Sequence, residues 1–185
     1  MGSAVSSVTY GRGFPKPAPL EVDGTALAVI DRTTGELIPP SEDPLVIRQW
    51  IEQVAQRLLD APEKMKDDVR HTILGDVYMR ELFIPKGFLL VGKLHKRACM
   101  NVVSKGDISV LTETGSARVQ AGYSVISPAG IQKLGFAHED TVFVNVFSLA
   151  GIATRDIAQI EKLLFCDSHA ALAQEEAQMM IEGTP

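Results

Sequence analysis

The chain has 185 residues and a formal net charge of −5, with 45% hydrophobic and 22% charged residues. This is the composition of an ordinary globular domain. The modest negative charge argues against a nucleic-acid-binding domain, and no apolar run approaches the roughly 20 residues of a membrane span. We therefore expect neither nucleic acid nor a membrane as a partner. The two cysteines, behind a start without a secretory signal, predict reduced thiols in a cytoplasm.

Residues 1–43 are interpreted as an extended N-terminal arm. Prolines interrupt any long element, at Pro15, Pro17, Pro19, Pro39 and Pro40. A short hairpin is predicted where residues 26–30 and 36–38 flank a Thr-Thr-Gly turn. An arm of this composition cannot build a core of its own. We expect it to lie on the domain or to reach a neighbouring subunit.

Residues 44–66 are predicted to form a helix followed by a linker. Asp43 suits the N-cap, and Pro44 suits the first helical position, where no amide donor is missed. Apolar residues recur at the helical period, at Ile47, Trp50, Ile51, Val54 and Leu58. Pro62 is expected to end the helix, and Trp50 is expected to anchor packing rather than to contact a ligand.

From residue 67 to residue 150 the pattern changes to short runs rich in Val, Ile, Phe and Tyr, separated by turn signals such as "SKGD", "TETGS" and "PAG". About seven or eight short strands at this spacing predict an antiparallel sandwich or barrel. Residues 151–185 become helical again. The first helix has Ile157, Ile160, Leu163 and Leu164 in register and contains Cys166, and the second has Asp167 as its cap. The predicted fold class is mainly β, with an N-terminal arm and helix and with C-terminal helices.

Glycines and prolines of the barrel region recur in two fixed patterns. In the first, five residues separate Gly87 from Lys93-Leu94-His95, and Cys99 and Gly106 follow after three and six further residues. In the second, five residues separate Gly122 from Pro128-Ala129-Gly130, and Lys133 follows after two more. Both patterns resemble the motifs of the cupin barrel, a jelly roll, over about residues 75–149. Phrases such as "GKLHK" and "AHEDTVF" also resemble small uncharacterised cupin proteins encoded by bacteriophages.

The framework also has a physical logic of its own. Its glycines supply the positive φ that tight turns require. Strand alternation places Lys93 and His95 on the same face. The resemblance implies that this face is the barrel interior and that Lys133 enters it from the second motif, across the barrel.

The cupin metal site, as the resemblance implies it, consists of three histidines and a glutamate, and this chain departs from it. The corresponding positions hold Lys93, His95, Cys99 and Lys133, and the final Asn of the second motif is Ala137. Protonated lysines offer no lone pair and repel a divalent cation. His95 and Cys99 supply two ligands where zinc or iron takes three or four, and a third from His71 or Glu81 would lack the motif spacing. We expect no bound metal and no cofactor.

The same substitutions favour an anion. With Arg80 and His95, interior lysines at 93 and 133 would bind phosphate or carboxylate; alternatively, both lysines extend to the barrel mouth and keep their charge in water. Cys99 is a candidate nucleophile with His95 as its base. No orienting acid for His95 is evident, which favours the alternative that Cys99 is a small buried residue in a tight turn.

Two classes of function remain open. The first is a non-catalytic cupin-like module with a structural or binding role, forming a homo-oligomer through its arm and terminal helices. If the phage resemblance holds, it would be a virion-associated protein with virion or host proteins as partners, located in the virion or the host cytoplasm. The alternative is a cupin enzyme. It would be an isomerase or epimerase of an anionic sugar or nucleotide sugar with His95 as base, or else a metal-dependent oxygenase.

Overall fold

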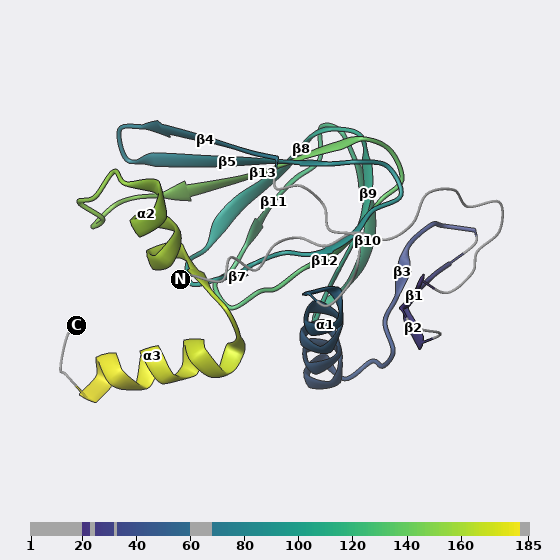
Figure 1. Cartoon of the computed structure of the whole chain (residues 1–185). Helices are drawn as coiled ribbons and strands as arrows, with labels where there is room; N and C mark the ends of the chain where they lie inside the picture. The colour runs from purple at the N-terminus through teal and green to yellow at the C-terminus, as the bar shows by residue number, and fades with distance from the viewer. Residues whose placement is uncertain (1–19, 23–24, 32, 60–67, 182–185) are drawn as a thin grey trace.

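The structure of the chain is a computed structural model that describes residues 20–22, 25–31, 33–59 and 68–181 (Figure 1). Its barrel consists of two antiparallel sheets. The five-stranded sheet has the order β11 (Ser124–Ser127), β8 (Cys99–Lys105), β13 (Thr141–Ser148), β5 (Val77–Ile84), β4 (Val69–Leu74). The four-stranded sheet has the order β10 (Gly115–Gln120), β9 (Asp107–Thr112), β12 (Leu134–Ala137), β6 (Leu89–Val91). The predicted fold class is confirmed as a cupin-like antiparallel jelly roll with helices before and after it.

Alternation along the strands sorts side chains between the barrel interior and the outer face of the four-stranded sheet. On β12, Gly135 lines an interior cavity, whereas Leu134 and Phe136 pack in a cluster with helix α1. On β9, Ile108 lines the same cavity and Leu111 joins the outer cluster. Side chains from β5 and β13 line the cavity from the other sheet. The two sheets therefore face each other across one interior.

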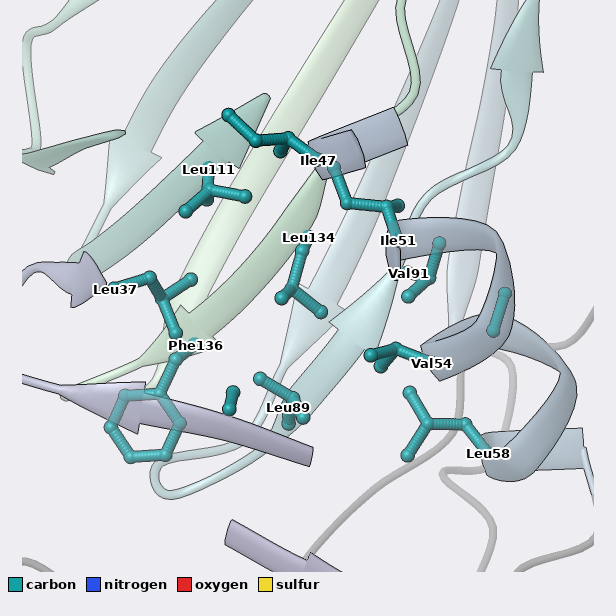
Figure 2. Packing of buried hydrophobic residues seen from close by; sticks show 12 residues of the cluster. Leu37, Ile47, Ile51, Val54, Leu58, Leu89, Val91, Leu111, Leu134 and Phe136 are labelled. Atoms are coloured by element: carbon teal, nitrogen blue, oxygen red, sulfur yellow. The ribbon is translucent and has the colours of Figure 1, made fainter. Parts of the chain in front are cut away.

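Helix α1 (Pro44–Leu59) covers the outer face of the four-stranded sheet. Its cap is the predicted one, because the Asp43 carboxylate accepts a hydrogen bond from the Leu45 amide at 2.9 Å. Figure 2 shows the buried side of the helix against the sheet, with Ile47, Ile51, Val54 and Leu58 facing Leu89, Val91 and Leu134. Trp50 is partly buried against the same cluster, as predicted. Truncating one of the fully buried side chains would cost roughly 2–5 kcal/mol, so α1 is part of the barrel's fold.

The described part of the arm lies on its own barrel. β1 (Leu20–Val22), β2 (Thr25–Ile30) and β3 (Leu37–Ile38) form a small sheet, with the predicted turn between β2 and β3. The Ser109 hydroxyl donates to the Gly35 carbonyl at 2.6 Å, and Arg118 donates to a carbonyl in the same turn at 3.1 Å. We predicted that the arm would either lie on the domain or reach a neighbouring subunit, and this hairpin lies on the domain. Residues 1–19 lie outside the described residues.

Helix α2 (Ile157–Leu164) closes one end of the barrel. The Asp156 carboxylate caps it by accepting a hydrogen bond from the Gln159 amide at 2.9 Å. Ile160 and Leu164 are fully buried, in a cluster that includes Tyr78 and Phe147 from the five-stranded sheet. The other two members of the predicted stripe, Ile157 and Leu163, are exposed.

The segment after α2 differs from the prediction. Residues Phe165–Cys166 form strand β14, which pairs antiparallel with β7 (Leu94–His95). Cys166 is therefore not helical, because this tertiary pairing overrides the local helical pattern. The next helix, α3 (His169–Ile181), is capped by Ser168 rather than by Asp167, since the Ser168 hydroxyl accepts the Ala171 amide at 3.1 Å. Helix α3 extends away from the barrel (Figure 1).

The glycines of the two cupin-like patterns all adopt positive φ, at Gly87, Gly106, Gly122 and Gly130. This bears out the role in tight turns that the sequence predicts for them. Gly106 is the most constrained, because a Cβ there would lie 2.5 Å from the Asp140 carbonyl oxygen and 2.5 Å from the Thr141 hydroxyl. Among the described residues, no helix is long and apolar enough to cross a membrane.

Candidate functional site

A cavity of about 50 Å³ lies between the two sheets inside the barrel. Its polar lining residues are Arg80, Lys93, His95, Lys133 and Asn145, and the rest of its wall is glycine or apolar. The four residues that the sequence nominates for anion binding therefore meet at one place. The volume exceeds the roughly 10–15 Å³ that one water molecule needs, so the cavity has room for a small polar ligand.

The backbone explains why the two motifs converge here. Lys93 and His95 alternate with Leu94, which is fully buried on the other side of the chain. The Gly92 amide donates to the Lys133 carbonyl at 2.8 Å, so the two motif segments are neighbours in one sheet. The expectation that Lys133 faces Lys93 from across the barrel is therefore wrong. Arg80 and Asn145, paired in register on β5 and β13, line the cavity from the opposite sheet.

Lys133 is the most unusual of these residues. Its side-chain nitrogen is buried and has no hydrogen-bond partner within the described part of the chain. Burial lowers the pKa of the Lys133 ammonium below the ordinary lysine value, because the charged form loses its hydration. Snorkelling to the barrel mouth does not describe this side chain. An unpaired cation in this position is costly unless a partner arrives or the proton leaves.

Lys93 and Arg80 share one carboxylate, that of Glu161 on α2. The Lys93 ammonium lies 3.0 Å from Glu161 Oε2, and the Arg80 Nε lies 3.3 Å from Glu161 Oε1. Burial alone would raise the pKa of Glu161, but the hydrogen bond and charge of Lys93 and the charge of Arg80 hold it below its usual value. Both cations also lie over the Phe165 ring, at 5.2 Å and 5.8 Å from its centre.

Glu161 is a site residue that sequence reasoning missed. It lies outside both motifs and follows Ile160 on the predicted helix, where a glutamate looks like an ordinary solvated charge. The available signal was its place beside the apolar stripe of a helix that must pack on the barrel. That signal becomes specific only when the helix is known to close the end of the barrel that contains Lys93.

His95 and Cys99 form a buried pair next to the cavity. The distance between Cys99 Sγ and His95 Nδ1 is 3.1 Å, and Sγ also lies 3.6 Å from Asn101 Oδ1. Burial, followed by the charges of Lys133 and Arg80, lowers the pKa of His95 well below its usual value, so the imidazole is neutral. Burial also raises the pKa of Cys99, although Lys133 opposes this shift. Cys99 is therefore a protonated thiol rather than a reactive thiolate.

The hydrogen bonds of this pair assign the histidine tautomer. One thiol proton cannot serve both neighbours of Sγ. Both contacts are satisfied when His95 Nδ1–H donates to Sγ and the thiol donates to the Asn101 oxygen. His95 Nε2 is then an acceptor. The network continues from Asn101 to Asn145 and Ser127, each at 2.8 Å.

The two further residues considered as metal ligands lie elsewhere. The His71 ring bonds the Tyr78 hydroxyl at 2.7 Å, and the Glu81 carboxylate pairs with Arg70. In the part of the chain that the structure describes, no three His, Cys, Asp or Glu side chains are grouped as a metal site. The predicted lack of a metal stays a prediction, and it is one that elemental analysis of the purified protein can test.

No protein-family model and no curated protein sequence matches this chain. Its fold is similar to a cupin-2 domain protein from Shewanella frigidimarina, 15% identical, with a TM-score of 0.38 over 44% of this chain and 79% of that one. KdgF from Halomonas is 16% identical, with a TM-score of 0.41 over 49% and 81%. A cupin domain from Bordetella pertussis is 22% identical, with a TM-score of 0.36 over 45% and 97%. The first and the third of these are described as cupin-domain proteins, in keeping with the predicted resemblance, and the likeness is one of fold alone.

Proposed function

We propose that this cupin-fold protein is a binding module that holds a small anion, a carboxylate or a phosphate, inside its barrel. The observation that carries the proposal is the buried Lys133 nitrogen, which has no hydrogen-bond partner among the residues described. A buried cation is stable when an anion pairs with it, and charge-assisted hydrogen bonds are about twice as strong as neutral ones. An oxygen of a bound carboxylate or phosphate would supply the missing partner.

The charge around the cavity supports an anionic ligand whichever protonation state Lys133 adopts. Arg80 and Lys93 carry two positive charges, against the one negative charge of the Glu161 carboxylate that both contact. His95 adds no charge, because its imidazole is neutral. No Asp or Glu is among the cavity-lining residues in the described ranges. The net charge around the cavity is therefore positive, and the low dielectric of the interior strengthens its attraction for an anion.

The size of the cavity limits the ligand to a few heavy atoms. The cavity holds about 50 Å³, and apolar side chains such as Leu82, Ile84, Leu90 and Phe143 form most of its wall. A surface groove of about 340 Å³ shares Val110, Lys133 and Phe143 with it. A sugar phosphate or nucleotide sugar would therefore have to place its anionic end in the cavity and the remainder in the groove.

A cupin enzyme is the second candidate, and His95 is the observation that favours it. A general base must be unprotonated, and His95 is neutral with Nε2 assigned as an acceptor. Its neighbours Lys133 and Arg80 would stabilise an anionic substrate. Isomerase or epimerase chemistry on a small anion fits this arrangement better than the oxygenase, which requires a metal-ligand set. The homo-oligomer and the virion-associated or structural role remain predictions.

Thermal unfolding in the presence of small anions tests the binding proposal. Phosphate, glycolate and acetate are added at constant ionic strength to the parent protein, to Lys133→Met and to Lys105→Met, which removes an exposed lysine from β8. A ligand at about 100 times its Kd stabilises by about 2.7 kcal/mol, which raises Tm by about 5–10 °C in a chain of this size. The parent and Lys105→Met should respond, and Lys133→Met should not. Equal responses of all three proteins would overturn the proposal.

A further inference from the structure

We propose that the Lys133 amine is a nucleophile that forms a Schiff base with a small 2-oxo carboxylate inside the barrel. This inference rests on the proposed function, because the positive surplus of the cavity holds the carboxylate of the same molecule. It goes further, since it makes Lys133 a reacting group rather than a passive cation. The chemistry needs a primary amine that is neutral, accessible and free of a carboxylate partner.

The amine is placed where a carbonyl compound can reach it. Lys133 lines both the interior cavity and the surface groove, as do Val110 and Phe143, so the two spaces meet at this side chain. The groove opens beside β11, where Tyr123 is 43% exposed and Ile126 is 69% exposed. A small molecule can therefore enter from the groove, and the Lys133 nitrogen, which is buried in this conformation, must turn into one of the two spaces to meet its carbonyl carbon.

The surroundings keep this amine reactive. Within the described residues its nitrogen has no hydrogen-bond partner, so no carboxylate there holds the proton on it. Burial favours the neutral form by lowering the pKa of Lys133, and a lysine that loses its hydration becomes a better nucleophile at neutral pH. Apolar neighbours such as Ile108 and Phe143 exclude much of the water that would hydrolyse an imine.

The reaction balances without an oxidant or a reductant. The Nζ lone pair attacks the carbonyl carbon, and the π electrons of the C=O bond move to its oxygen, which takes one of the two protons of the attacking nitrogen to give a neutral carbinolamine. The carbinolamine nitrogen then loses its proton, the C–O bond breaks, and one water molecule leaves as the C=N bond forms. His95 lines the same cavity in its neutral form, so it can accept the proton from nitrogen and return it to the departing hydroxyl.

The other cations select the class of carbonyl compound. Arg80 and Lys93 lie at the same cavity and have one carboxylate between them, that of Glu161. A carboxylate next to the reacting carbonyl would complete their pairing, whereas a plain aldehyde would leave it incomplete. The cavity volume of about 50 Å³ favours the smallest members of the 2-oxo acid class.

Reductive trapping tests the inference on the full chain. The folded protein is incubated with glyoxylate and cyanoborohydride at neutral pH, and peptide mapping then locates the carboxymethylated lysines. Lys133 should be labelled several-fold faster than the exposed lysines, because a lowered pKa raises the neutral fraction of its amine. In Lys133→Met the fast label should disappear, whereas in Lys105→Met it should remain. Equal labelling of all lysines, or a fast label that survives in Lys133→Met, would overturn the inference.

Glycolate separates the failure of this inference from the failure of the proposed function, and it needs no variant. It carries the carboxylate but has a hydroxyl in place of the carbonyl. If an anion site exists, glycolate should stabilise the parent protein and should slow the labelling of Lys133. If glycolate stabilises the protein but Lys133 carries no fast label, the Schiff base is refuted and the proposal of anion binding is kept. If glycolate does not stabilise the protein and Lys133 carries no fast label, both proposals are refuted. A fast label that glycolate does not slow would refute the claim that the cavity holds the carboxylate.

Discussion

Replacing Lys133 by methionine should stabilise the protein when no anion is present. Methionine has nearly the length of lysine and no polar atom at its end, so it fills a similar volume beside the cavity while removing the buried amine. The parent protein must either keep a buried ammonium that has no hydrogen-bond partner in the described part of the chain, or release its proton. Both states are less favourable than the hydrated ammonium of the unfolded chain, and the variant avoids both.

The size of the effect has an upper limit set by deprotonation. Releasing the proton of a lysine with an ordinary pKa of about 10.4 costs roughly 4.6 kcal/mol at pH 7, at about 1.36 kcal/mol per unit. Replacing buried ionic groups by apolar side chains of similar volume has stabilised other proteins by about 1–4 kcal/mol. We expect a gain in this range, which raises Tm by roughly 2–4 °C for each kcal/mol.

Urea unfolding of both proteins between pH 7 and pH 10 measures the effect and its sign. The folded-state pKa of Lys133 is lowered by burial, so above that pKa the unfolded chain binds more protons than the folded one. The penalty in the parent is largest below the folded pKa and fades as the pH rises toward about 10.4. The advantage of the variant should therefore shrink with rising pH, at an unchanged m-value.

Two results would refute this reasoning. A Lys133→Met protein that is less stable than the parent at pH 7 would mean that the amine already has a favourable partner. An advantage that does not change with pH would mean that Lys133 keeps its ordinary proton affinity. In either case the buried amine would no longer support anion binding or nucleophilic chemistry.

Four further outcomes are expected. Ser109→Ala should lose about 1–3 kcal/mol, since its hydroxyl links the β2–β3 hairpin to the barrel, and unchanged urea unfolding would contradict this. Hydrogen bonds from Arg118 lower the pKa of Asp107, so the stability that this pair contributes above about pH 4 should fade in acid. Arg118→Met should lose less stability between pH 6 and pH 3 than the parent, and an equal loss in both proteins would contradict this. Glu161→Gln should tighten anion binding about three- to tenfold by calorimetry, because it frees Arg80 and Lys93 to pair with the ligand. An unchanged affinity would mean that these two cations do not contact the ligand. Sedimentation at micromolar concentration should show a homo-oligomer, and a monomer would end that expectation.

The sequence by itself carried the local geometry of this protein. The helical stripe around Ile51 and the cap at Asp43 predicted α1, because capping and period act within a few residues. Glycine spacing predicted the tight turns of the barrel, because positive φ is a property of a single residue. Strand alternation, together with the cupin resemblance, placed Lys93 and His95 on one interior face, and both line the cavity.

Only the tertiary structure decided which charges are paired. Glu161 lies 68 residues from Lys93 in the chain, and it pairs with that lysine because α2 packs onto the end of the barrel. The pairing of β7 with β14 likewise replaced the last residues of a predicted helix, Phe165 and Cys166, since their partner strand comes from a distant segment. Lys133 has the same residue type and motif role as Lys93, yet its nitrogen is buried and finds no hydrogen-bond partner among the residues that the structure describes. Burial and pairing depend on what the rest of the chain brings to a side chain, and local sequence patterns do not contain that information.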